Sequence, residues 1–167
     1  MGLFSFLKKK TTKTTNQTAE KKVIQQEFIA TATTNADKLV NSFNDKLEHV
    51  LDYSIGSLQV LDQEILSLFH DNKDDMGDGL LEDITVQAGS YVFEVARRTF
   101  GGTYYWYDAL NQPILVTGQP SFEISLLAYE KVKGRILNGD ENHIHYFFKG
   151  FEEKVLNARP GDKAMIR

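Results

Sequence analysis

The chain has 167 residues, of which 41% are hydrophobic and 11% aromatic, and this is sufficient for one domain with a packed core of ordinary size. The absence of cysteine excludes disulfide scaffolds, thiolate metal sites and cysteine nucleophiles. The net charge of −4 divides unevenly, because residues 1–22 hold six lysines and one glutamate (+5) and the remainder therefore carries −9. An acidic body argues against binding of nucleic acid by the fold, and we expect no nucleic-acid partner.

The first ten residues are an apolar stretch followed by a basic one. The side chains concerned are Leu3, Phe4, Phe6, Leu7, Lys8, Lys9 and Lys10. The apolar stretch is too short for a signal peptide and the lysines follow it, so we expect a cytoplasmic protein. Such a segment can also contact the anionic inner face of a membrane, since each lysine near the surface contributes about 1 kcal/mol. The alternative is a disordered start that binds nothing.

Residues 11–18 are polar and lack periodicity, which predicts a flexible linker. A short helix is expected at about 23–29, and the threonines that follow weaken its continuation. These features divide the chain into a flexible basic tail at 1–22, a single globular domain at 23–160 and a loose C-terminal tail at 161–167.

Two amphipathic helices follow, at about 39–50 and 58–70, with apolar residues at spacings of three and four. Their short connection predicts an αα-hairpin, in which Ser54 is expected to cap the second helix. A third, longer helix is expected from 81 to 99. Gly89 within it predicts a close helix crossing, since glycine there costs about 1 kcal/mol relative to alanine. Gly101 or Gly102 would then supply the left-handed C-cap.

Three short strands are predicted after the double glycine, at 103–107, 113–117 and 122–126. Their connections are too short for parallel crossovers, so the order is antiparallel. Two further amphipathic helices, at about 127–137 and 140–155, complete the chain. The expected fold class is therefore α+β: an N-terminal helical hairpin and a long third helix packed on a small three-stranded antiparallel meander, closed by two C-terminal helices.

Two segments invite a metal-binding interpretation. In the acidic loop at 71–79, the calcium-loop register that starts at Asp71 puts Met76 where the turn glycine belongs, and later registers lack the final glutamate. His143 and His145 are a close pair, but residues two apart on a helix do not share a face, so helix-surface positions are expected. We therefore expect no metal site and no cofactor.

Glu94 precedes Arg97 and Arg98 by three and four residues, which is the spacing of a helix-surface ion pair worth about 0.2–0.5 kcal/mol. A structural role is favoured over a catalytic one, and no catalytic residue is assigned. Because Glu94 and Arg98 come just before the aromatic strand, both are candidate binding residues.

That strand carries four consecutive aromatic residues, in which Tyr104 and Trp106 should point to one face and Tyr105 and Tyr107 to the other. A three-stranded sheet rarely has both faces covered in a domain of this size, so one pair is expected to be partly exposed for recognition. In that case alanine at Trp106 or Tyr104 should weaken partner binding and leave the melting temperature almost unchanged.

Short motifs between residues 39 and 151 resemble those of small, uncharacterised bacterial domains. The resemblance rests on Asp52-Tyr53-Ser54, on Ala88-Gly89-Ser90-Tyr91 with Glu94, Arg97 and Arg98, on Gly101-Gly102, and on Leu137-Asn138-Gly139. Such families bring no established activity and no catalytic residues, but some members resemble immunity proteins that neutralise the toxins of competing bacteria.

The first functional hypothesis is a non-enzymatic protein-binding protein, most concretely a toxin-neutralising immunity protein, because an acidic surface with exposed aromatic residues would suit a basic toxin face. The second hypothesis is a peripheral membrane adaptor that docks through its N-terminus. The third is an enzyme that uses carboxylates such as Glu94.

Overall fold

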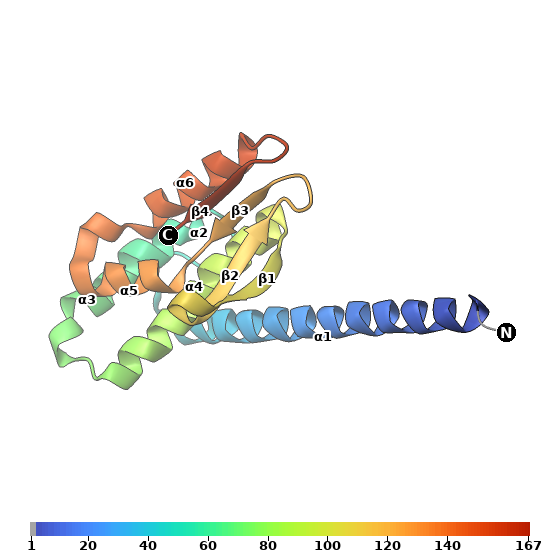
Figure 1. Ribbon diagram of the computed structural model, residues 1–167. Helices are drawn as coiled ribbons and strands as arrows, with labels where there is room; N and C mark the ends of the chain where they lie inside the picture. The colour runs from blue at the N-terminus through green and yellow to red at the C-terminus, as the bar shows by residue number, and fades with distance from the viewer. Residues whose placement is uncertain (1–2) are drawn as a thin grey trace.

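The computed structural model describes the backbone of residues 3–167 and the side chains of residues 19–167, and the fold is α+β as predicted. Helix α1 (Leu3–Phe43) runs along one side of the body, and its first part projects well beyond it (Figure 1). The linker predicted at 11–18 and the weakening predicted after residue 29 are thus wrong, since this helix is continuous. Residues 3–43 contain neither glycine nor proline, and threonine costs at most about 0.7 kcal/mol relative to alanine, so nothing local ends the helix.

The second half of α1 is held by packing on α4 (Asp78–Phe100). Ala32, Ala36 and Leu39 are buried there and belong to the main hydrophobic core. The helix ends at Phe43, earlier than the predicted end at residue 50, and continues as one 3₁₀ turn, η1 (Asn44–Lys46).

Residues 57–71 form one helical stretch with a π-helical middle. It consists of α2 (Ser57–Val60), the π-helical η2 (Leu61–Leu66) and α3 (Ser67–Asp71). The Ser54 hydroxyl accepts a hydrogen bond from the Ser57 N–H at 3.2 Å, so Ser54 caps this stretch as expected. The acidic loop that follows holds a 3₁₀ turn, η3 (Lys73–Asp75).

Helix α4 confirms the predicted third helix and crosses the middle of the body (Figure 1). Gly89 allows the close approach that was expected of it: a Cβ at this position would lie 2.3 Å from Cδ1 of Tyr129, the first residue of α5 (Tyr129–Asn138). Gly101 ends α4 with φ +73°, and its N–H donates to the Arg97 carbonyl at 2.9 Å.

The sheet has four strands in the order β1 (Thr103–Tyr107), β2 (Gln112–Thr117), β3 (Glu123–Leu126) and β4 (Lys163–Ile166). The first three are antiparallel as predicted, and a 3₁₀ turn, η4 (Asp108–Leu110), joins β1 to β2. The prediction of three strands and a loose tail at 161–167 is wrong, because β4 pairs with β3 in parallel. Main-chain hydrogen bonds fix it, including Leu127 N–H to Ile166 O at 2.9 Å.

After α5 the chain turns through the 3₁₀ segment η5 (Gly139–Asn142) into α6 (Ile144–Leu156). Helix α5 packs on α4, whereas α6 packs on α2, β3 and β4. The largest fully buried side chains lie between these elements, Tyr91, Phe93, Phe148 and Phe151 among them. At the β1 end of the sheet, α1 packs on β1, and Phe93 and Glu94 of α4 contact Tyr104 from beneath.

Candidate functional site

The aromatic strand is divided between core and surface. Tyr104 is 1% exposed, whereas Trp106, two residues later, is 49% exposed. Tyr105 is also half exposed and donates its hydroxyl proton to Gln119 Oε1 at 2.9 Å, and Tyr107 is partly buried. Neither predicted pair is therefore exposed as a unit, since each pair has one exposed member.

Tyr104 belongs to the core because two helices, α1 and α4, converge on it. Its ring stacks on Phe28 of α1 with centroids 6.2 Å apart, and its hydroxyl donates to Glu94 of α4 at 3.0 Å. Burial and the negative charge of Glu94 raise the pKa of Tyr104. The expectation that Tyr104 can be removed without loss of stability is contradicted by this burial.

Gln25 of α1 closes the outer edge of β1 at the same point. The Tyr104 N–H donates to Gln25 Oε1 at 2.8 Å, and the Gln25 Nε2 group donates to the Tyr104 carbonyl. The side-chain amide thus replaces a neighbouring strand for one residue, which protects an edge that could otherwise pair with another chain.

Beyond Tyr104 a groove of about 620 Å³ lies between α1 and the far end of β1. Its aromatic lining residues are Phe28, Tyr104, Trp106 and Tyr129. Its aliphatic lining includes Ile24 of α1, which is 49% exposed like Trp106. Two exposed carboxylates, Glu27 and Glu82, also line it. A concave, mostly apolar surface with a few polar groups is typical of a binding site.

Glu94 lies behind this groove in a buried ion-pair cluster. It is 0% exposed, and Arg97 contacts both of its oxygens at 2.8 Å while Arg98 contacts one at 3.3 Å. Burial alone would raise the pKa of Glu94, but the hydrogen bonds and charge of Arg97, with those of Tyr104 and Arg98, lower it below its ordinary value.

The predicted spacing of Glu94 with the two arginines is confirmed, but its position on the helix surface is wrong. Thr33 of α1 lies over the pair and donates to Glu94 Oε2 at 3.2 Å. Both carboxylate oxygens are occupied by structural partners, and this counts against a role for Glu94 as a catalytic base. The cluster ties α4 to α1 and to β1.

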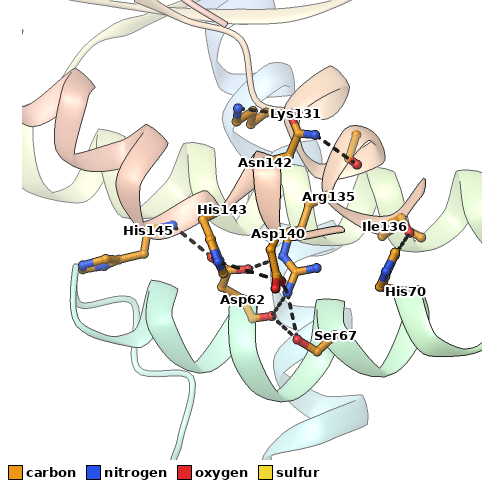
Figure 2. Close-up of polar contacts among 11 residues, drawn as sticks. Asp62, Ser67, His70, Lys131, Arg135, Ile136, Asp140, Asn142, His143 and His145 are labelled. Atoms are coloured by element: carbon orange, nitrogen blue, oxygen red, sulfur yellow. Dashed lines mark hydrogen bonds and ion pairs between the residues drawn. The ribbon is translucent and has the colours of Figure 1, made fainter. Parts of the chain in front are cut away.

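A second buried polar cluster joins the π-helical segment to the C-terminal helices (Figure 2). Asp62 of η2 is 1% exposed and accepts a hydrogen bond from Arg135 Nε of α5 at 2.6 Å. Arg135 also donates to the Ser67 hydroxyl at 2.8 Å, and His143 Nδ1 lies 3.1 Å from Asp62 Oδ2. The expected helix-surface position for His143 is therefore wrong, since this side chain packs into the cluster just before α6.

An aspartate beside a histidine is also the arrangement that orients a general base in hydrolases. Here the Ser67 hydroxyl hydrogen-bonds to Arg135 and not to His143, so no activated nucleophile results. His70 makes a separate contact with α5, donating from Nδ1 to the Ile136 carbonyl at 2.8 Å (Figure 2). Asp62, Ser67 and His70 thus hold residues 57–71 against Arg135 and Ile136 of α5 and against His143. We call the Asp62, Ser67, Arg135 and His143 contacts the clamp.

Sequence reasoning found Trp106 but missed Phe28, Glu27 and Glu82, which come from two other elements of the groove. It also missed Asp62 and Arg135, because each stands among other charged residues of its helix and nothing local marks it as buried. Among the side chains of residues 19–167, no group of three or more histidine and carboxylate residues is arranged to hold a metal ion.

The predicted membrane-contact side chains, Leu3 to Lys10, lie outside the described side chains. Within residues 3–167, none of the helices combines the length and apolar character needed to span a bilayer. Comparison of the chain with protein-family models, with curated proteins and with solved structures found no match. The function is therefore argued from the geometry of the site.

Proposed function

We propose that this chain is a non-enzymatic protein-binding protein and that a partner docks in the groove between α1 and β1. The observation that carries the proposal is the pairing of two half-exposed apolar side chains, Ile24 and Trp106, in the lining of one groove. Tryptophan supplies large, stiff contact area and is enriched among the residues that dominate binding energy at interfaces. Exposed apolar side chains that gather on one surface are typical of a protein interaction site.

The charge of the groove indicates the character of the partner. Glu27 and Glu82 line it, and no lysine, arginine or histidine among residues 19–167 does so. The chain beyond residue 22 carries −9. A partner surface that is both apolar and basic would complement this groove. The finer form of the proposal is that the partner is a toxin and that this chain is its immunity protein.

Site-specific photo-crosslinking tests the docking proposal. A photoreactive amino acid replaces Asn111, an exposed residue that lines the groove, or Tyr146, an exposed residue of α6 that serves as the control. After irradiation in the native host, the Asn111 variant is expected to give a discrete protein adduct that the Tyr146 variant does not give. Trp106→Ala in the same background should abolish that adduct.

Mass spectrometry then identifies the adduct, and the purified partner is tested for binding to the wild-type chain. The same adducts at both positions, or an Asn111 adduct that survives Trp106→Ala, would contradict docking in the groove. Co-expression with a toxin encoded by a neighbouring gene tests the finer form, in which Trp106→Ala should lose protection.

A second candidate function is peripheral membrane attachment. It is favoured by the projection of α1 away from the body, which places its first residues where a surface can be reached (Figure 1). Liposome flotation with and without residues 1–10 tests this candidate on anionic vesicles. Equal flotation of both chains would contradict it.

A further inference from the structure

We propose that the group recognised in the groove is cationic, an ammonium or guanidinium group carried on the partner. This inference deepens the proposed function. It rests on that function only for the claim that the cationic group belongs to a protein partner. It follows from two features of the groove, its aromatic lining and its carboxylates.

The aromatic lining supplies the first feature. Tyr104, Tyr129 and Phe28 are largely buried, whereas Trp106 keeps about half of its surface in solvent. The face of an aromatic ring attracts a cation held within about 6 Å of its centre, and tryptophan does so most strongly. Several rings around one space form the kind of aromatic cage that binds organic cations.

The carboxylates supply the second feature. Within residues 19–167 the carboxylates of Glu27 and Glu82 form no hydrogen bond or ion pair, although both residues line the groove. Burial raises the pKa of Tyr129, the hydrogen bond with Ser90 lowers it, and the negative charge of Glu82 raises it again.

A purely apolar occupant would remove water from these exposed carboxylates and offer no partner in return, and an anionic occupant would be repelled by them. The side-chain amides of Asn35 and Asn111 also line the groove, and their partly negative oxygens favour a cation over an anion. A cation therefore satisfies the aromatic, carboxylate and amide groups together.

Choline and its neutral isostere 3,3-dimethylbutan-1-ol are the probes that test the inference. They share shape and differ in charge, and sodium chloride keeps the ionic strength equal. Trp106 is the single tryptophan of the chain, so its fluorescence reports on the groove directly. We expect a saturable change in emission with choline and an affinity for the alcohol that is at least about threefold lower.

Glu82→Gln should lower the affinity for choline by about twofold to fivefold, because an exposed charge pair is lost. Glu153→Gln on α6 is the matched control and should leave the affinity unchanged, with both melting temperatures equal to that of the wild type. An absent response to choline, equal affinities for the two probes, or equal effects of the two variants would overturn the cation site.

These results are separable from the crosslinking experiment. An Asn111 adduct without selectivity for choline would retain protein docking and overturn the inference about the cation. Selectivity for choline without an adduct would retain the cation site and contradict the proposal that a protein carries the cation.

Discussion

Tyr104 and Trp106 lie two residues apart on β1, and their different surroundings lead to opposite predictions. Tyr104→Ala removes a fully buried ring and should cost about 3–5 kcal/mol of unfolding free energy. Trp106→Ala removes a half-exposed ring and should cost less than about 1 kcal/mol while it weakens partner binding. Urea denaturation followed by circular dichroism measures both values. A larger loss for Trp106→Ala would show that this ring supports the core and would contradict its role as a binding residue.

Glu94 gives a prediction about pH. Its folded-state pKa lies below the ordinary glutamate value of 4.5, so its contribution to stability is present above that value and is lost as the pH falls through the lower, folded-state value. At pH 7 the substitution Glu94→Gln should cost about 1.5–3 kcal/mol, because hydrogen bonds to the arginines lose their charge. Chemical denaturation at pH 7 and near pH 3 should show the difference from the wild type becoming smaller at the lower pH. A difference that stays constant would contradict the lowered pKa.

At the scale of elements, the clamp between η2 and α5 should be a main source of stability for the C-terminal half. Asp62→Asn leaves the buried guanidinium of Arg135 without its buried carboxylate partner, which should cost about 3–5 kcal/mol. Asp140→Asn is the matched control, since this exposed carboxylate lies 3.5 Å from the same guanidinium and should contribute less than about 0.5 kcal/mol. Equal losses of unfolding free energy for the two variants in denaturation experiments would show that the buried ion pair contributes no more than the exposed one.

The same elements show which parts of the fold are readable from the sequence. Helix α4 and strands β1–β3 have strong local signals, namely a 3.6-residue period, a double glycine and short turns, and all were predicted. Strand β4 has only four residues, and a run this short next to the C-terminus does not stand out from a tail in the sequence. Only its partner β3 makes it a strand, and a parallel partner distant in sequence leaves no local signal.

The groove could be predicted only in part for a related reason. Trp106 stands out by its type and by its place in an aromatic run, so sequence reasoning included it. Glu27 and Glu82 are ordinary exposed charges on two helices, and their relation to Trp106 arises from the packing of α1 against α4. Burial of Glu94 has the same origin, because the spacing of an ion pair does not reveal which helix lies over it.

At the scale of the whole molecule, α1 combines two parts with different tasks. Its first part extends beyond the body, and its second part packs on α4 and closes the edge of β1 (Figure 1). Gln25 and Phe28 mark the beginning of the packed part, where the helix first contacts Tyr104. The stability of the body should therefore depend on the residue at which α1 begins. The same residue should decide whether the outer edge of β1 is covered.

Two truncations of α1 test this division. Removal of residues 1–18 deletes most of the projecting part and should change the unfolding free energy of the body by less than about 0.5 kcal/mol. Removal of residues 1–28 also deletes Gln25 and Phe28, which exposes the ring of Tyr104 and frees the edge of β1. That chain should lose about 2 kcal/mol or more from the buried ring contacts and should self-associate through the open edge strand. Denaturation gives the first quantity and light scattering over a concentration series gives the second. A monomeric 29–167 chain as stable as the 19–167 chain would show that α1 neither supports the core nor protects the sheet at this point.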